Sequence, residues 1–265
     1  MEHYPDIRLL LIDLDGTLYL NKTLYEGVNE AIQVLREKYQ LRFLTNTDSL
    51  TKQEMYQKLA EIGVDAQPNE IYTAVDCLKA FLKQKQPCSI FPVMSAGLHA
   101  EFLEQFPLND KDPDFVVVSD CRDTLQYQLA NQAFRALQNG AELIASQKGK
   151  YFFSSDGINM DTGAIVAMLE YSSSKEAAIL GKPSPQFFLG VMAEAGYMPN
   201  QTMVIGDDIT TDIAGGGAIG ARTVLVRTGK FEESALQNST IRPSIILGGF
   251  SELPALLGMH EKRDR

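Results

Sequence analysis

The 265-residue sequence has few of the residues that form disulfides, zinc sites or histidine-based active sites. Its three cysteines, Cys77, Cys88 and Cys121, are widely spaced and form no CxxC pattern, which argues against a disulfide framework and against a zinc site. Only three histidines are present, and none lies beside a candidate nucleophile in the sequence, so histidine-based triad chemistry has little support. This cysteine usage favours a reducing, cytoplasmic environment.

Positive charge and long apolar runs are also scarce. The net charge of −10 disfavours nucleic acid and anionic membrane surfaces as partners. No apolar run approaches the length of a membrane span, and the N-terminal MEHYPDIR lacks the basic region and apolar core of a signal peptide. The remaining composition, 45% hydrophobic and 22% charged, is typical of a soluble globular protein with one large or two medium domains.

The stretch from Arg8 to Leu18, RLLLIDLDGTL, runs an apolar strand directly into two carboxylates. Leu9 to Ile12 form the short apolar run expected of a strand buried on both faces of a parallel sheet, and Asp15-Gly16 is a turn signal. Because side chains alternate along an extended chain, Asp13 and Asp15 face one side at the carboxyl end of the strand, where open α/β sheets bind ligands. One carboxylate could attack while its neighbour moves protons. The alternative is that Asp15 is a solvated turn residue, as in many isolated Asp-Gly pairs, but the full DLDGTL after a buried strand favours the first interpretation.

Helical and strand patterns then alternate. Glu26 to Lys38 predicts an amphipathic helix and Leu41 to Leu44 a second apolar strand, which indicates a right-handed βαβ unit. This strand ends in Thr45-Asn46-Thr47-Asp48, small polar residues at the sheet edge where Asp13 should also emerge. Further strands are expected at 202–205, 223–226 and 245–247. The pattern predicts an α/β fold with a doubly wound, Rossmann-like parallel sheet.

A second α/β pattern lies between two polar stretches, Lys83 to Pro87 and Ser172 to Lys175. Strands are expected there at 90–93, 115–118 and 143–145, and helices at 98–105, 125–137 and 163–171. Since the strand-end acids and the later motifs lie on both sides of this module, we interpret 84–175 as an inserted α/β cap domain. The catalytic core would comprise 1–83 and 176–265, with 260–265 as a solvated tail.

Two later motifs place charged residues beside strand ends. Lys182 precedes Pro183, which favours an extended backbone at Lys182, and Ser184-Pro185 has the chemistry of a helix start. The expected strand at 202–205 ends in GDDITTD, which supplies Asp207, Asp208 and Asp212. Asp207 and Asp208 could simply favour the start of the next helix through its dipole.

Convergence of several of these acids in one site indicates a metal. Without a cation, bringing Asp13, Asp15 and Asp207 together would raise some of their pKa values. Mg²⁺ takes one or two protein carboxylates together with phosphate oxygens, which matches this set. The Gly215-Gly216-Gly217 run in the following helix costs roughly 1 kcal/mol per glycine relative to alanine, and close packing against the sheet would explain it.

Together these motifs resemble those of the haloacid dehalogenase (HAD) superfamily. DLDGTL is similar to its first motif, DxDGT; Thr45 matches the Ser or Thr of its second; the GKP around Lys182 resembles the third and GDDITTD the fourth. With the inserted module, the chain resembles type IIA (NagD-like) HAD phosphatases over nearly its whole length. The resemblance implies a Mg²⁺-dependent phosphatase that hydrolyses a small phosphorylated metabolite through an aspartyl-phosphate intermediate.

The resemblance also implies roles for individual residues. Asp13 would be the nucleophile and Asp15 the general acid/base, with Thr45 and Lys182 completing the catalytic set. Mg²⁺ would be held by Asp13, Asp207 and a main-chain oxygen of Asp15. Asp208 and Asp212 would contact these ligands without binding the metal themselves. The substrate would be bound by Gly16, Asn46, Thr47 and Lys148, although type IIA members usually carry a second Asn where this chain has Thr47.

Several alternatives remain open at this point. Where type IIA phosphatases commonly carry Thr-Asn-x-Asp, this chain reads Ser146-Gln147-Lys148-Gly149, so Lys148 either attracts a second anionic group of the substrate or solvates a surface turn.

The scissile bond could be P–O–P or P–N, as in pyrophosphatase-like and phospholysine/phosphohistidine phosphatase relatives. A non-catalytic phosphometabolite-binding protein is a third alternative, which the joint presence of Asp13, Asp15 and Lys182 disfavours. Dehalogenase activity is disfavoured because dehalogenases of the superfamily lack the Asp15 equivalent. A homodimer is considered, but the sequence does not decide it.

Overall fold

The computed structural model of the chain describes residues 4–154 and 157–259. Contacts between Cα atoms divide the chain into two compact units: unit 1 comprises Met1–Thr45, Lys52–Tyr72 and Lys182–Arg265, and unit 2 comprises Asn46–Thr51 and Thr73–Gly181. The predicted solvated tail at 260–265 lies outside the described residues. Among the helices that are described, none has the length and apolar character needed to cross a membrane.

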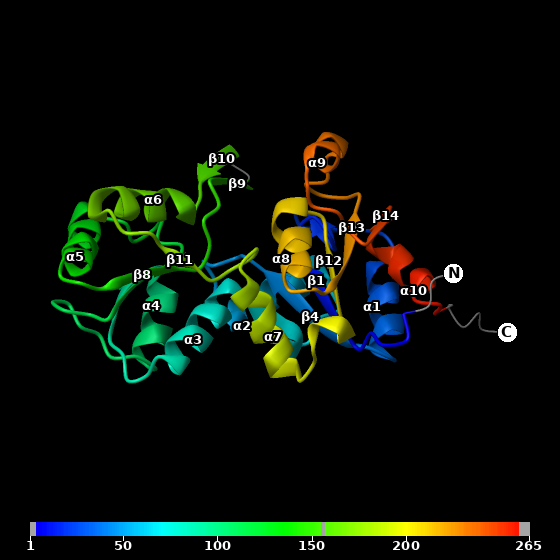
Figure 1. Cartoon of the computed structure of the whole chain (residues 1–265), viewed down its shortest axis with the longest axis horizontal. Helices are drawn as coiled ribbons and strands as arrows, with labels where there is room; N and C mark the ends of the chain where they lie inside the picture. Colours follow the sequence, from blue (N-terminus) through cyan, green and yellow to red (C-terminus); the bar gives the residue numbers. More distant parts are fainter. Residues whose placement is uncertain (1–3, 155–156, 260–265) are drawn as a thin grey trace. The chain divides into compact units, whose positions relative to one another are not determined.

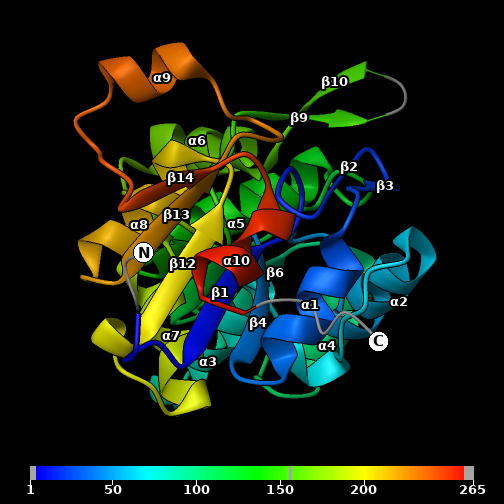
Figure 2. The same ribbon diagram turned by 90° about the vertical axis from the view of Figure 1, so that its right-hand side faces the viewer.

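A six-stranded sheet in the order β14-β13-β12-β1-β4-β5 forms the centre of unit 1 (Figure 2). The central strand β1 (Leu9–Asp13) pairs in parallel with β12 (Thr202–Gly206) on one side and with β4 (Gln40–Thr45) on the other. All five residues of β1 are buried, as its apolar sequence predicts for a strand covered on both faces. The sheet continues through β13 (Arg222–Val226), β14 (Ile245–Leu247) and β5 (Ile71–Thr73). The predicted doubly wound α/β fold is confirmed.

Helices cover both faces of this sheet. Figure 1 shows α7 (Pro185–Ala195) and α8 (Ala214–Ala218) on one face, and α1 (Val28–Arg36) and α10 (Leu253–Leu256) on the other. The α1 helix buries one apolar stripe, Val28, Ala31, Ile32 and Leu35. The unit also contains the helices α2 (Lys52–Ile62), α9 (Glu233–Asn238), η1 (Pro68–Glu70), η2 (Pro199–Gln201), η3 (Ile209–Ile213) and η4 (Phe250–Glu252), and the hairpin of β2 (Tyr19–Leu20) and β3 (Thr23–Leu24).

Close packing explains two of the three consecutive glycines in α8. A Cβ atom on Gly215 would overlap the ring of Phe188 in α7, and one on Gly216 would lie 2.9 Å from side-chain atoms of Thr223 and Val204 in the sheet. The glycines therefore let α8 approach α7 and the sheet more closely than larger residues would. Gly217 faces open space, and nothing in the structure explains it.

Unit 2 has a parallel sheet of its own, in the order β11-β8-β7-β6. The strands are β6 (Ile90–Val93), β7 (Phe115–Val118), β8 (Glu142–Ala145) and β11 (Ala178–Ile179). Figure 1 shows α5 (Tyr127–Gln138) and α6 (Thr162–Ser173) on one face, and α3 (Ala74–Gln84) and α4 (Ala96–Leu103) on the other. Between β8 and α6 lies a hairpin of β9 (Tyr151–Ser154) and β10 (Gly157–Met160).

The compact units differ in extent from the domains expected from the sequence, 84–175 for the cap and 1–83 with 176–265 for the core. Helix α3 groups with unit 2 because its side chains contact that unit: Lys79 forms a 2.5 Å ion pair with Glu101, and the ring of Phe81 packs edge to face against Phe115. Segments 46–51 and 176–181 also group with unit 2. Such contacts join residues far apart in the chain and leave no mark in local composition.

Candidate active site

Three neighbouring strands of unit 1 end in the predicted site residues. Asp13 is the last residue of β1, Thr45 is the last residue of β4, and Asp207 follows β12 directly. Because β1 lies between β12 and β4 in a parallel arrangement, these three ends meet at one edge of the sheet. All three residues are buried. The strand-end spacing in the sequence therefore translates directly into proximity in space.

Lys182 connects two of the acids in this site. Its ammonium Nζ lies 2.5 Å from Asp13 Oδ1 and 2.8 Å from Asp212 Oδ1, and all three side chains are almost fully buried. Burial disfavours the charged ammonium, but the adjacent Asp13 and Asp212 carboxylates outweigh it and raise the pKa of Lys182. The lysine is therefore a fixed cation within the site.

The pKa values of Asp212 and Asp207 are both raised in this arrangement. Burial raises the pKa of Asp212 to about 7, against the opposing effect of Lys182 and with a contribution from Asp13. Burial, together with Asp13 and Asp212, raises the pKa of Asp207 to about 8, and a 2.6 Å hydrogen bond from the Lys230 backbone N–H to Asp207 Oδ2 opposes that shift. Burial thus outweighs the stabilisation that Lys182 gives the Asp212 carboxylate and that the Lys230 N–H gives the Asp207 carboxylate.

The carboxylates of Asp13, Asp207 and Asp212 fit a metal ion. One oxygen from each lies within 4.8 Å of the other two, and all three residues are buried. Carboxylate oxygens are the ligands that Mg²⁺ prefers, and a divalent cation would offset both the burial and the charge repulsion that raise the pKa values of Asp207 and Asp212. The structure thus gives Asp212 a direct place in the acidic cluster, whereas the sequence predicted it behind the ligands.

Asp15 differs from Asp13 in being exposed. Partial burial still raises the pKa of its carboxyl, opposed by Lys58 and reinforced by the nearby Asp13. A raised pKa suits a group that must donate and later accept a proton. The two carboxylates of the first motif therefore have different environments, which is consistent with two different roles.

Gly16 has a steric role in the same turn. Its φ is +91°, its N–H donates to the carbonyl oxygen of Tyr19 at 2.7 Å, and a Cβ atom there would overlap the carboxylate of Asp207. Gly229 lies against the same carboxylate and has a φ of +56°. Both positions need glycine because the backbone has a positive φ there and a Cβ atom would overlap the Asp207 carboxylate. Contact of Gly16 with substrate stays a prediction.

Asp208 serves mainly as a helix cap. Its Oδ1 accepts hydrogen bonds from the N–H (2.8 Å) and the hydroxyl (2.6 Å) of Thr210, at the start of η3. Its other oxygen lies 3.5 Å from Lys230 Nζ. Although burial opposes ionisation, these Thr210 and Lys230 contacts lower the pKa of Asp208. Asp208 therefore lies at the start of this helix, where the sequence predicted an acid favoured by the helix dipole, and it also caps the helix.

The other predicted substrate-binding residues belong to unit 2. Asn46 and Thr47 are half-buried in the segment that follows Thr45, and the side chain of Asn46 approaches Gly181, the residue before Lys182. Lys148 forms a 2.7 Å ion pair with Glu170, so its charge already has an anionic partner within unit 2. A role for these three residues in binding substrate stays a prediction.

Comparison with known proteins identifies the family. A model described as haloacid dehalogenase-like hydrolase matches residues 10–105, and a second one, described as HAD-hydrolase-like, matches 179–253. The chain is 34% identical to bovine (Bos taurus) haloacid dehalogenase-like hydrolase domain-containing protein 2 over 90% of each chain. The chain belongs to the haloacid dehalogenase-like hydrolase family. It is also 30% identical to human (Homo sapiens) phospholysine phosphohistidine inorganic pyrophosphate phosphatase, over 96% of this chain and 95% of that protein.

Solved structures place this HAD hydrolase among phosphatases of the NagD-like type. A 4-nitrophenylphosphatase from Thermotoga maritima aligns with a TM-score of 0.88 at 29% identity, covering 97% of this chain and all of the other. NagD from E. coli K-12 aligns with a TM-score of 0.84 at 26% identity, covering 93% and 98% of the two chains. The predicted family and the predicted phosphatase class are confirmed, and with them the non-catalytic alternative is set aside.

Some residues of the HAD site were not singled out from the sequence. Thr17 is buried, and its hydroxyl donates to Asp13 Oδ2 at 3.0 Å and lies 3.4 Å from Asp207 Oδ1. It is the threonine of the DxDGT motif, so the motif itself could have indicated it. Lys230, whose backbone N–H holds Asp207, follows strand β13 in a Thr-Gly-Lys turn. A polar turn after a strand at the catalytic sheet edge was the available signal.

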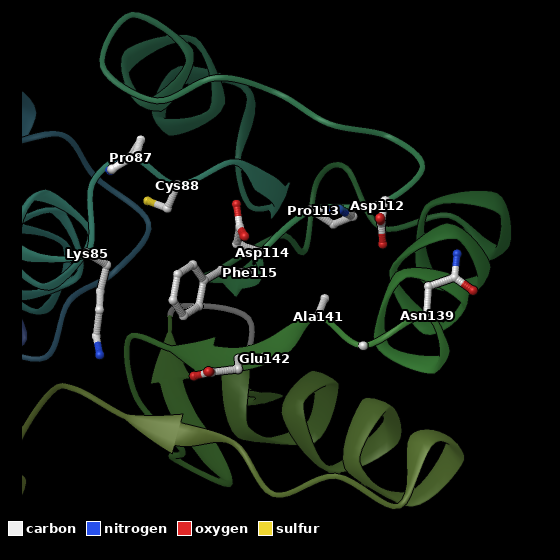
Figure 3. Close-up of a pocket in the computed structure, with 11 residues that line it drawn as sticks. Lys85, Pro87, Cys88, Asp112, Pro113, Asp114, Phe115, Asn139, Ala141 and Glu142 are labelled. Atoms are coloured by element: carbon white, nitrogen blue, oxygen red, sulfur yellow. The ribbon is translucent and has the colours of Figure 1, made fainter.

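Unit 2 contains a pocket of about 500 Å³ (Figure 3). It opens at the amino-terminal ends of the unit 2 strands, where Phe115 and Glu142 begin β7 and β8. Lys85, Cys88, Asp112, Asp114 and Asn139 are among the residues that line it. None of the predicted site residues contributes to it.

Proposed function

We propose that this HAD phosphatase hydrolyses a small phosphorylated metabolite through an aspartyl-phosphate intermediate on Asp13, with Mg²⁺ as cofactor. The observation that carries the proposal is the environment of Asp13, a buried carboxylate at a strand end that receives a hydrogen bond from Thr17 and an ion pair from Lys182. These two donors fix the orientation of the Asp13 carboxylate. A carboxylate held in one orientation can be aligned for attack on phosphorus. A second carboxyl, Asp15, follows two residues later.

In the first step a carboxylate oxygen of Asp13 attacks phosphorus, and the bond from phosphorus to the leaving oxygen breaks. Asp15 donates its proton to that oxygen, for which its raised pKa is suited. In the second step Asp15 takes a proton from water as the water attacks the acyl phosphate. This releases inorganic phosphate and restores both carboxyls.

Lys182 and the metal would balance charge during this reaction. Asp13, Asp207 and a main-chain oxygen of Asp15 would hold Mg²⁺, and Asp212, the third member of the acidic cluster, would lie beside these ligands. When bound, the ion supplies positive charge that stabilises the phosphoryl oxygens. Thr45, Asn46 and Lys182 would provide the remaining donors to the phosphoryl group, as hydrogen bonds aimed at developing charge.

The leaving group is a separate question, and one relative bears on it. The human protein that is 30% identical carries phospholysine, phosphohistidine and inorganic pyrophosphate in its name, so P–N and P–O–P bonds are second candidates. We propose to compare phosphate release from a panel of phosphorylated metabolites, pyrophosphate and phosphohistidine under identical conditions. The panel member with the highest kcat/KM identifies the class of leaving group. Light scattering on the same preparation determines whether the protein forms a homodimer, and cell fractionation tests a cytoplasmic location.

The covalent step has a direct test in Asp13→Asn. The variant should lose phosphate release by several orders of magnitude, because an amide oxygen is a poor nucleophile. Acid-quenched wild-type protein should gain the mass of one phosphoryl group during turnover, on the peptide that contains Asp13. Asp6→Asn, an exposed acid of the same unit, is the matched control and should retain full activity. Substantial turnover by a well-folded Asp13→Asn protein would exclude the covalent mechanism.

A further inference from the structure

The segment 46–51 of unit 2 lies against the carboxyl ends of three parallel strands. Ser119 and Ser146 directly follow β7 and β8, and Ser95 is the second residue after β6. The hydroxyl of Ser95 donates to the carbonyl oxygen of Ser49 at 3.3 Å, and that of Ser119 donates to the carbonyl oxygen of Asp48 at 2.5 Å. Open α/β sheets bind their ligands at this edge. In unit 2 a segment of the chain itself, 46–51, occupies it.

Asp48 is the residue that anchors this segment. It is 4% exposed, and its Oδ2 accepts hydrogen bonds from the Ser146 hydroxyl at 2.5 Å and from the Thr162 hydroxyl at 2.8 Å. Ser146 and Thr162 are themselves buried, and they lie 98 and 114 positions from Asp48 in the sequence. With the contact at its carbonyl, Asp48 accepts hydrogen bonds from three hydroxyl groups on three different parts of unit 2.

The same region also holds the chain beside Lys182. The backbone N–H of Gly181 donates to the carbonyl oxygen of Ser146 at 2.7 Å, and a Cβ atom on Gly181 would overlap that oxygen and crowd the side chain of Asn46. Ser146 therefore contacts the anchor of segment 46–51 through its side chain and the residue preceding Lys182 through its backbone. Segment 46–51 in turn begins directly after Thr45.

Taken together, the geometry points to Asp48 as a positioning residue for Asn46: by fixing segment 46–51 within unit 2, it sets where Asn46 presents its side-chain donor. The inference rests on the proposed role of Asn46 in binding the phosphoryl group. Asp48 itself touches no substrate in this account. Its hydrogen bonds act through the backbone of Thr47, the one residue that separates it from Asn46.

Replacing Asp48 also changes the charge near other acids, and this electrostatic change is an alternative explanation for any loss of activity. Asp120 and Asp161 are the acids within electrostatic reach, and Arg122 neutralises Asp120 through an ion pair. Asp161 caps α6 through the N–H of Thr162 and also accepts from the Gln147 amide. Asp48→Asn keeps an acceptor oxygen for Ser146 and Thr162 while removing the charge. This variant therefore distinguishes the effect of losing the hydrogen bonds from the effect of losing the negative charge.

The test combines amide hydrogen exchange with steady-state kinetics on 4-nitrophenyl phosphate. Asp48→Ala should raise exchange in 46–51 at least tenfold and lower kcat roughly 10- to 100-fold with a smaller change in KM, because displaced donors no longer match the reacting phosphoryl group. Asp48→Asn should restore most of both. Ser146→Ala and Thr162→Val, each missing one hydrogen bond, should give intermediate effects even where Asp48→Ala folds poorly.

Asp114→Ala is the matched control, since Asp114 also accepts from a serine, the N–H and hydroxyl of Ser89, in unit 2. It should leave kcat and exchange in 46–51 unchanged. The inference is overturned if Asp48→Ala leaves kcat unchanged, or if the control lowers it equally at matched stability. A wild-type protein that released no phosphate would instead defeat the proposed function, and the exchange data would still decide whether Asp48 holds the segment.

Discussion

Lys182 lies between two buried carboxylates, with its Nζ 2.5 Å from Asp13 and 2.8 Å from Asp212. The ammonium therefore does two things at once: it orients the Asp13 carboxylate, and it partly neutralises an acidic cluster that also contains Asp207. A buried cation held by two acids tolerates no loss of charge, because each acid would remain buried without compensation.

Lys182→Met should therefore destabilise the folded protein as well as abolish activity. We expect the free energy of unfolding to fall by about 3–5 kcal/mol in metal-free buffer, since truncating one partner leaves buried charge unpaired. Adding Asp212→Asn removes one of those charges and should recover part of the stability but none of the activity. Urea denaturation of the single and double variants measures the difference. Equal stability of the two would show that Asp212 and Lys182 are not coupled.

Asp15→Asn should affect substrates according to their leaving groups. Loss of acid/base catalysis predicts a fall in kcat of roughly 10²- to 10⁴-fold with alkyl phosphates. The fall should be smaller with 4-nitrophenyl phosphate, whose leaving oxygen needs little protonation. Parallel measurement of kcat on both substrates checks this. Identical losses on the two would argue that Asp15 acts on binding or folding instead.

Removal of divalent metal should silence the enzyme, and Mg²⁺ should restore it. Binding to the acidic cluster should also raise the melting temperature of the resting protein, because a ligand that binds only the folded state stabilises it. Asp207→Asn should abolish that rise, whereas Asp6→Asn, an exposed acid, should keep it. Ca²⁺ should support activity poorly because it takes more ligands at longer distances. Full activity in a chelator would contradict the metal requirement.

Asp48 should make stability depend on pH. Burial raises its pKa to about 7, against the opposing hydrogen bonds from Ser146 and Thr162 and with help from Asp161 and Asp120. In the unfolded chain an Asp has a pKa of about 3.9. Between this pH and the folded pKa of about 7, Asp48 retains a proton in the folded state that the unfolded state has lost. The stabilising contribution is complete below pH of about 4 and is lost as pH rises to about 7.

Asp48→Asn removes this titration and should flatten the pH profile of stability. Comparison of urea unfolding between pH 5 and 7.5 isolates the contribution, which is at most about 1.4 kcal/mol per pH unit. The other raised acids, Asp207 and Asp212, are present in both proteins and cancel in the difference. Parallel profiles for the variant and the wild type would show that Asp48 does not titrate in this range.

The sequence by itself determined the fold and the strand-end part of the site. Apolar runs followed by acids or small polar residues predicted strands at β1, β4 and β12, and the carboxyl ends of parallel strands meet at one edge. That rule was sufficient to place Asp13, Thr45 and Asp207 together. The strands β5 and β11 and the two hairpins were not predicted; β11, β2 and β3 have only two residues each, too few to show an alternating pattern.

Only the tertiary structure decided which side chains pair within that edge. Lys182 is 169 residues from Asp13, and Ser146 is 98 residues from Asp48, so no local pattern records either contact. Tertiary packing likewise decided that Gly16 makes room for Asp207 and that segment 46–51 groups with unit 2. Local sequence fixes backbone periodicity through nearby residues, whereas hydrogen bonds and ion pairs in a buried site depend on distances between elements, which exist only after the chain has folded.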